Sequence, residues 1–146
     1  LNNFYLGEES TFGSQDGDNI RGLNTDDKIW ARDGNDKVRA GDGNDIVYGG
    51  AGNDKLIGGN GNDQLDGGVG DDKLYAGEGD DILIGGDGNN YLRGGDGHDR
   101  LTAGNGRDKL VGGNGNDQLD SGAGDDKLYA GDGDDILISG DGNDYL

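Results

Sequence analysis

The chain has 146 residues, of which 35 are Gly, 31 are Asp or Glu and 12 are Lys or Arg, so its net charge is −19. It contains no Cys, which excludes disulfides, thiol nucleophiles and Cys-type zinc sites, and no apolar run is long enough to span a membrane. The negative charge opposes binding to nucleic acid or to anionic membranes. Because the chain begins at Leu1 and contains no Met, we expect it to be a segment of a larger protein.

The first predicted element is residues 1–12, which depart from the pattern that fills the rest of the chain. They contain a dense apolar group, Phe4, Tyr5, Leu6 and Phe12. A stack of repeats leaves apolar surface open at its end, so the terminal segment differs from the repeats themselves. We therefore predict that residues 1–12 form an N-terminal cap.

Residues 13–146 follow a nine-residue repeat without a gap, as about fifteen copies of Gly-Gly-x-Gly-x-Asp-x-apolar-x. The first six positions are rich in Gly and predict a turn. The last three predict a very short strand whose middle, aliphatic side chain points inward. One inward apolar side chain per repeat suits a narrow coil in which two copies of the repeat make each turn.

The sixth position of the repeat is Asp in every copy but one, and such a coil stacks these residues in two columns. Successive carboxylates would lie about 5 Å apart and repel one another, so a cation must lie between them. Calcium, which accepts carboxylate and carbonyl oxygens together, fits better than magnesium. One column contains Asp18, Asp36, Asp54, Asp72, Asn90, Asp108, Asp126 and Asp144, and the other contains Asp27, Asp45, Asp63, Asp81, Asp99, Asp117 and Asp135.

The nonapeptide resembles the calcium-binding repeat of the repeats-in-toxin (RTX, hemolysin-type) family. The stretches GGAGNDKLI at 49–57 and GGNGNDQLD at 58–66 match that repeat at every defined position. The resemblance implies an all-β fold, a right-handed parallel β-roll (a β-solenoid) with two repeats per turn over residues 13–146. It also implies that the sixth-position residues supply side-chain ligands to calcium and that turn carbonyls complete the coordination.

Sites between neighbours within each column give about 9–13 calcium ions per chain. The sites at Asp18 and Asp27 are expected to be weaker, because Asp16 and Thr25 replace Gly in their turns. Asn90 offers a neutral oxygen, so the sites beside it are expected to be filled but weaker. The fifth-position residues, His98 among them, are expected to point outward.

These features predict a calcium-binding structural module that folds on binding calcium. The resemblance implies that it is part of a secreted bacterial toxin, adhesin or hydrolase, exported by a type I system and located outside the cell or on the bacterial surface. No enzyme activity is predicted, because no Ser has a His and an acid in register.

The alternative function is a flat, repetitive adhesion or self-assembly surface that calcium stabilises. Apolar side chains such as Trp30, Tyr48 and Ile84 are expected on the outer faces of the coil. The predicted partners are calcium ions and the remainder of the parent protein. Self-association is expected to use the outer sheet faces or the open C-terminal end.

Overall fold

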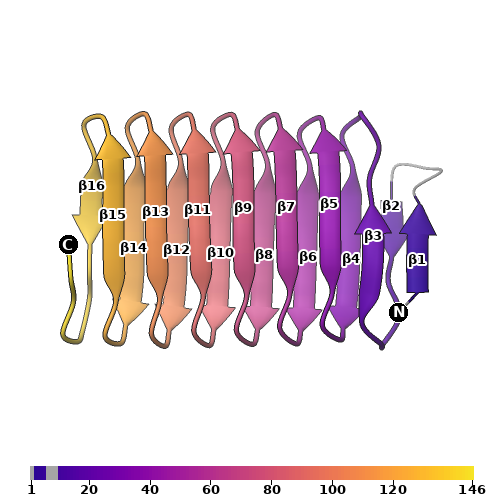
Figure 1. The fold of residues 1–146 in the computed structure, drawn as a ribbon, viewed down its shortest axis with the longest axis horizontal. Coiled ribbons are helices and arrows are strands. Elements are labelled where there is room, and N and C mark those ends of the chain that lie inside the picture. The colour runs from indigo at the N-terminus through magenta and orange to yellow at the C-terminus, as the bar shows by residue number, and fades with distance from the viewer. Residues whose placement is uncertain (1, 6–9) are drawn as a thin grey trace.

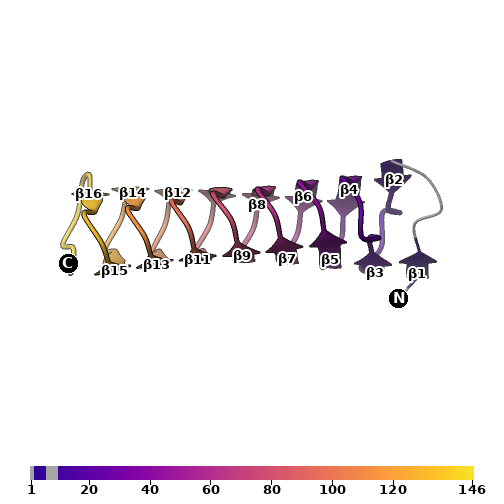
Figure 2. The ribbon, with the colours of Figure 1, turned by 90° about the horizontal axis from the view of Figure 1, so that it is seen from above.

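The fold is a parallel β-solenoid, as expected from the repeat. The computed structural model describes residues 2–5 and 10–146, which form sixteen strands and no helix. The odd-numbered strands make one eight-stranded sheet and the even-numbered strands make the other, and all the pairings within each sheet are parallel (Figure 1). Figure 2 shows the two sheets as two layers along a rod. The prediction of an all-β, two-sheet parallel roll is confirmed.

The strands of the first sheet are β1 (Asn2–Tyr5), β3 (Asp18–Arg21), β5 (Lys37–Asp42), β7 (Lys55–Asn60), β9 (Lys73–Glu78), β11 (Tyr91–Asp96), β13 (Lys109–Asn114) and β15 (Lys127–Asp132). Those of the second sheet are β2 (Ser10–Phe12), β4 (Lys28–Asp33), β6 (Ile46–Ala51), β8 (Gln64–Val69), β10 (Ile82–Asp87), β12 (Arg100–Asn105), β14 (Gln118–Ala123) and β16 (Ile136–Ile138).

Neighbouring strands of one sheet pair in a constant register, two copies of the repeat apart. Leu83 in β10 pairs with Leu65 on one side and with Leu101 on the other. The first pairing of the odd-numbered sheet differs, since Asn2 pairs with Asp18 rather than with Ile20. The described parts of residues 1–12 therefore add one strand to each sheet. Residues 1 and 6–9 of the predicted cap lie outside the described residues, and the cap remains a prediction.

The strands are longer than the sequence analysis predicts. The predicted six-residue turn is wrong, because the turn is shorter. β7 runs from Lys55 through Gly58 and Gly59 to Asn60, so positions seven to nine and one to three of the repeat form one strand. Alternation along a strand places both the eighth and the first position inward. The first position is accordingly buried, as at Ala76 and Ser121. The turn itself is limited to positions four to six.

The core consists of two ladders of eighth-position side chains that meet between the sheets. From Ile20 to Leu128, each of these side chains is at most 1% exposed. Small first-position residues, among them Ala31, Ala40 and Ala103, complete the same buried cluster. Because each ladder residue packs on the residues two repeats before and after it, its truncation leaves a cavity inside the stack.

We expect Leu83→Ala to lower the free energy of unfolding by about 2–5 kcal/mol, because Leu83 is fully buried. Its neighbour Ile82 is 44% exposed on the same strand, so Ile82→Ala provides a matched control expected to change stability by no more than about 0.5 kcal/mol. Denaturant unfolding of both variants in excess calcium measures the difference. Equal losses for the two variants would contradict the assignment of the inward ladder.

The outer faces of the two sheets differ in character. The odd-numbered sheet carries Lys37, Lys55 and Lys73 on consecutive strands and Lys109 and Lys127 on two more, with Tyr91 between the two groups. The even-numbered sheet carries exposed Ile82, Ile136 and Ile138. Phe12, which the sequence analysis placed in the cap, stacks on Trp30 with 4.8 Å between ring centroids.

Candidate metal centre

The sixth-position side chains line the inside of the turns at the two long edges of the rod. Each one except Asp144 immediately precedes or begins a strand, so the turns before odd-numbered strands gather one column and those before even-numbered strands gather the other (Figure 1). From Asp18 to Asp126, none of the thirteen is more than 3% exposed. Asp135 and Asp144, in the last two turns, are half-buried. The two predicted columns are thus present, with nearly all their carboxylates removed from solvent.

From Asp36 onward, one oxygen of each sixth-position side chain accepts a backbone N–H from the preceding turn of its column. The backbone N–H of Asp18 donates to Oδ1 of Asp36 at 2.6 Å, and that of Asp36 donates to Oδ1 of Asp54 at 2.8 Å. The same bond recurs at every second repeat as far as Asp135 and Asp144. Oδ1 therefore has a fixed partner in each of these turns.

The other oxygen is buried without a partner in ten of these turns. A buried acceptor that has lost its water and gained no donor is costly, and more so when it is charged. The unpaired oxygens are Oδ2 of Asp36, Asp45, Asp54, Asp63, Asp72, Asp81, Asp99, Asp108, Asp117 and Asp126. Ten equivalent unpaired atoms in register indicate a common missing partner.

The turn that contains Asn90 shows what surrounds that second atom. Asn90 keeps the Oδ1 bond, at 3.0 Å from the backbone nitrogen of Asp72. Its Nδ2 lies where the other turns have Oδ2, and donates to the carbonyls of Gly86 at 3.2 Å and Gly88 at 3.3 Å. In an Asp turn, two carbonyl oxygens and a carboxylate oxygen would therefore face the same space. Such an all-oxygen set suits a hard cation such as calcium.

Glycine at the second and fourth positions makes this carbonyl arrangement accessible. Gly88 has φ of 125°, in the region that residues with a Cβ rarely adopt. A Cβ there would also collide with the carbonyl oxygen of Gly70 in the preceding turn of the column. The repeat therefore needs Gly at the fourth position both for the backbone conformation and for the close stacking of turns.

Burial opposes ionisation of these carboxylates. Removal from water, together with the smaller effect of neighbouring carboxylates in the same column, raises the pKa of Asp54, Asp63 and Asp81 from the usual 3.8 to about 7. The hydrogen bond that each Oδ1 accepts acts in the opposite direction but is the smaller effect. Charged carboxylates at these positions thus require a compensating positive charge.

The first two turns have a different arrangement. Their second position is Ser14 or Leu23 rather than a residue with positive φ. The backbone N–H of Ser14 donates to Oδ2 of Asp18 at 2.6 Å, and that of Leu23 donates to Oδ2 of Asp27 at 2.7 Å. In these two turns the second position therefore directs an N–H towards Oδ2, whereas in the Asn90 turn the second position, Gly86, directs its carbonyl inward. This agrees with the expectation that Asp18 and Asp27 are weaker ligands.

The fifth-position side chains form a second ladder that sequence reasoning missed. The Asn and Asp side chains at this position are exposed, and those followed by another turn accept its backbone N–H; for example, Oδ1 of Asn53 accepts from Asp71 at 2.8 Å. His98 takes part in the same way, since its Nδ1 accepts from the Asn116 N–H at 2.8 Å. The recurrence of Asn and Asp at the fifth position could have indicated this ladder, because both side chains carry an oxygen that accepts a hydrogen bond.

The described residues, these turns included, contain no group of three or more His, Cys, Asp or Glu side chains that could hold a metal ion by side chains alone. A cation in the columns would therefore take much of its coordination from backbone carbonyls. Within the part of the chain that the structure describes, no helix is long and apolar enough to cross a membrane.

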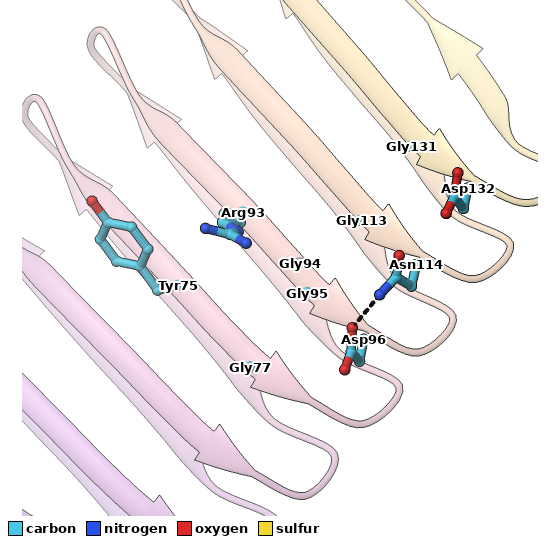
Figure 3. A pocket seen from close by; sticks show the side chains of 10 residues that line it. All are labelled: Tyr75, Gly77, Arg93, Gly94, Gly95, Asp96, Gly113, Asn114, Gly131 and Asp132. Atoms are coloured by element: carbon cyan, nitrogen blue, oxygen red, sulfur yellow. Dashed lines mark hydrogen bonds between the residues drawn. The ribbon is translucent and has the colours of Figure 1, made fainter.

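A shallow trough also lies on the odd-numbered sheet, away from the carboxylate columns. Glycines such as Gly95 and Gly113 lie along it, with Tyr75 and Arg93 towards one side and Asp96, Asn114 and Asp132 towards the other (Figure 3). Nδ2 of Asn114 donates to Oδ1 of Asp96 at 2.6 Å. The trough brings no Ser or His beside an acid.

Comparison with known proteins identifies one family. The chain matches the RTX calcium-binding nonapeptide repeat in four copies, at residues 12–47, 39–74, 75–110 and 111–146. No curated protein matches the chain.

Proposed function

Because this chain belongs to the family of RTX calcium-binding nonapeptide repeats, we propose that its two Asp columns hold calcium ions and that calcium binding drives folding of residues 13–146. The observation that carries the proposal is the set of ten buried Oδ2 atoms without a partner. No protein donor contacts them in the structure, whereas one class of ion, a hard divalent cation, would satisfy all ten.

The residues proposed to hold calcium are the sixth-position aspartates, together with carbonyls of the second and fourth positions. When bound, calcium supplies positive charge between carboxylates and additional links between neighbouring turns. The aspartates are Asp36, Asp54, Asp72, Asp108, Asp126 and Asp144 in one column and Asp45, Asp63, Asp81, Asp99, Asp117 and Asp135 in the other, with Asp18 and Asp27 as weaker ligands in the first turns.

The wider role follows from the family. RTX repeat proteins are typically secreted by type I secretion, so we place this chain outside the cell or on the bacterial surface. The roll itself is a non-catalytic module, and any toxin, adhesin or hydrolase activity would belong to the rest of a parent protein. Residues 1–12 would cap the roll, and its outer faces would offer surfaces to the parent protein or to another copy.

Counting the bound ions tests this function. Equilibrium dialysis of the chain against calcium is expected to give about 9–13 bound ions per chain, because nearly every pair of neighbouring turns offers one site. Magnesium at the same concentration is expected to bind far less, since it retains its water and requires a small octahedral site. A result of one or two calcium ions per chain would refute the proposal.

A further inference from the structure

We propose that the turn ending at Asn90 holds no calcium, because the side-chain amide of Asn90 takes the place of the ion. This inference rests on the proposed function of the two columns. It replaces the simpler expectation, drawn from residue type alone, that the sites beside Asn90 are filled but weaker.

The hydrogen bonds of Asn90 fix the direction of its amide. Oδ1 accepts the N–H of Asp72, as the equivalent carboxylate oxygens do throughout the column. Turning the amide over would place its NH2 group against that N–H and its single oxygen against the carbonyl oxygens of Gly86 and Gly88. Asn90 therefore cannot present its oxygen to an ion without losing the contacts on both sides.

The amide nitrogen also stands where each Asp turn places Oδ2, so this turn presents a hydrogen-bond donor in place of a ligand oxygen. A Cβ placed on Gly85 would lie 2.9 Å from Nδ2 of Asn90 and 3.1 Å from the carbonyl oxygen of Ala103, so both atoms border the gap between this turn and the next of its column. Asn90 is 2% exposed, and its side-chain atoms are absent from the set of buried atoms without a partner. A neutral donor thus satisfies the carbonyls that an ion satisfies elsewhere.

The interruption affects only one edge of the rod. It separates the run Asp36, Asp54 and Asp72 from the run Asp108, Asp126 and Asp144. The opposite column continues from Asp45 to Asp135 with Asp in every turn. The middle of the roll would therefore contain one link between turns that forms without metal.

Another part of the chain supplies a natural comparison. The turn 139–144 differs from the turn 85–90 at two positions only, with Ser139 for Gly85 and Asp144 for Asn90. Asn90→Asp therefore recreates a side chain that this turn sequence already carries elsewhere. The opposite change, Asp81→Asn, places an amide in the uninterrupted column, where Oδ1 would keep the N–H of Asp63.

The test is the number of calcium ions bound at saturation, measured by equilibrium dialysis of the folded chain. Asn90→Asp is expected to bind one ion more than the natural sequence, and Asp81→Asn one ion fewer. Asn116→Asp makes the same change at an exposed fifth position, where Oδ1 accepts the N–H of Asp134, and is expected to leave the count unchanged.

The outcomes separate this inference from the proposed function. If the natural sequence binds no calcium, the proposed function fails and this inference fails with it. If the natural sequence binds calcium and Asn90→Asp binds the same number, the proposed function stands and this inference is overturned. Should Asn90→Asp fail to fold, the count for Asp81→Asn decides, because an unchanged count would mean that an amide does not replace the ion.

Discussion

In excess EDTA the chain is expected to give the circular dichroism of an unfolded chain, and added calcium is expected to convert it to a β spectrum. With a net charge of −19 and only 29% hydrophobic residues, the metal-free chain has little apolar surface to offset its self-repulsion. About ten calcium ions would add a charge of about +20 and relieve the buried carboxylates. The change in secondary structure is therefore expected to be large.

The shape of that titration carries further information. Each interior turn shares its sites with both neighbours, so binding and folding are expected to be one cooperative event with a Hill coefficient clearly above one. EDTA should reverse the change, and magnesium at equal concentration should produce little of it. A chain that is already β-rich in EDTA would contradict calcium-driven folding. Stability would then come from the ladders that contain Leu83 and Leu101 and from the terminal strands.

In EDTA, lowering the pH from about 8 to about 5 is expected to stabilise the metal-free fold. Burial raises the pKa of Asp54, Asp63 and Asp81 to about 7 in the folded state, against 3.8 for an unperturbed carboxyl. The folded state therefore binds more protons than the unfolded state between these values. This contribution to stability is fully present below the unfolded pKa and is lost as the pH rises through about 7.

The fraction of the chain with β circular dichroism in EDTA, measured at several pH values, checks this prediction, because a chain that is unfolded at about pH 8 is expected to gain β structure as the pH falls. Asp63→Asn removes one such carboxyl and is expected to flatten the pH dependence. Asp71→Asn provides the matched control, because Asp71 is exposed and Asn retains the oxygen that accepts the N–H of Asn89. Metal-free stability that rises from pH 5 to pH 8 would contradict the prediction. In calcium the direction is expected to reverse, since protons compete with the ion for the carboxylates.

The fold was predictable because its signal is periodic. An aliphatic residue at the same position of every repeat places Leu83 and Leu101 in neighbouring strands of one sheet, and they are paired in the structure. The same spacing of two repeats per turn places the sixth-position aspartates in two columns, and their side chains are buried inside the turns as this arrangement requires. Repetition compensates for the weak signal of any single copy, since every copy carries the same inward position.

Features that depend on the direction of a peptide or an amide were not predictable from residue types. The inward carbonyl of Gly86 and the inward N–H of Ser14 come from equivalent positions, and only the backbone conformation separates them. Residue type alone assigns Asn90 as an oxygen donor to calcium, whereas the proposal of an ion-free turn rests on the oxygen's orientation towards the N–H of Asp72. The full length of the strands could be predicted only by recognising that the first position of the repeat, for example Ala76, also points inward.

The two-repeat register sets a rule for how such a rod can change length during evolution or by engineering. Removing two consecutive repeats deletes one full turn and returns every later side chain to its original sheet, so the lysines stay on the odd-numbered face. Removing a single repeat preserves the motif but moves every later strand to the opposite sheet. If the repeat is removed between Ile82 and Lys109, then Lys109 and Lys127 follow the exposed Ile82 on the other face, and the two carboxylate columns exchange their C-terminal parts. Length is therefore free to vary in steps of two repeats, whereas a step of one repeat rearranges both surfaces.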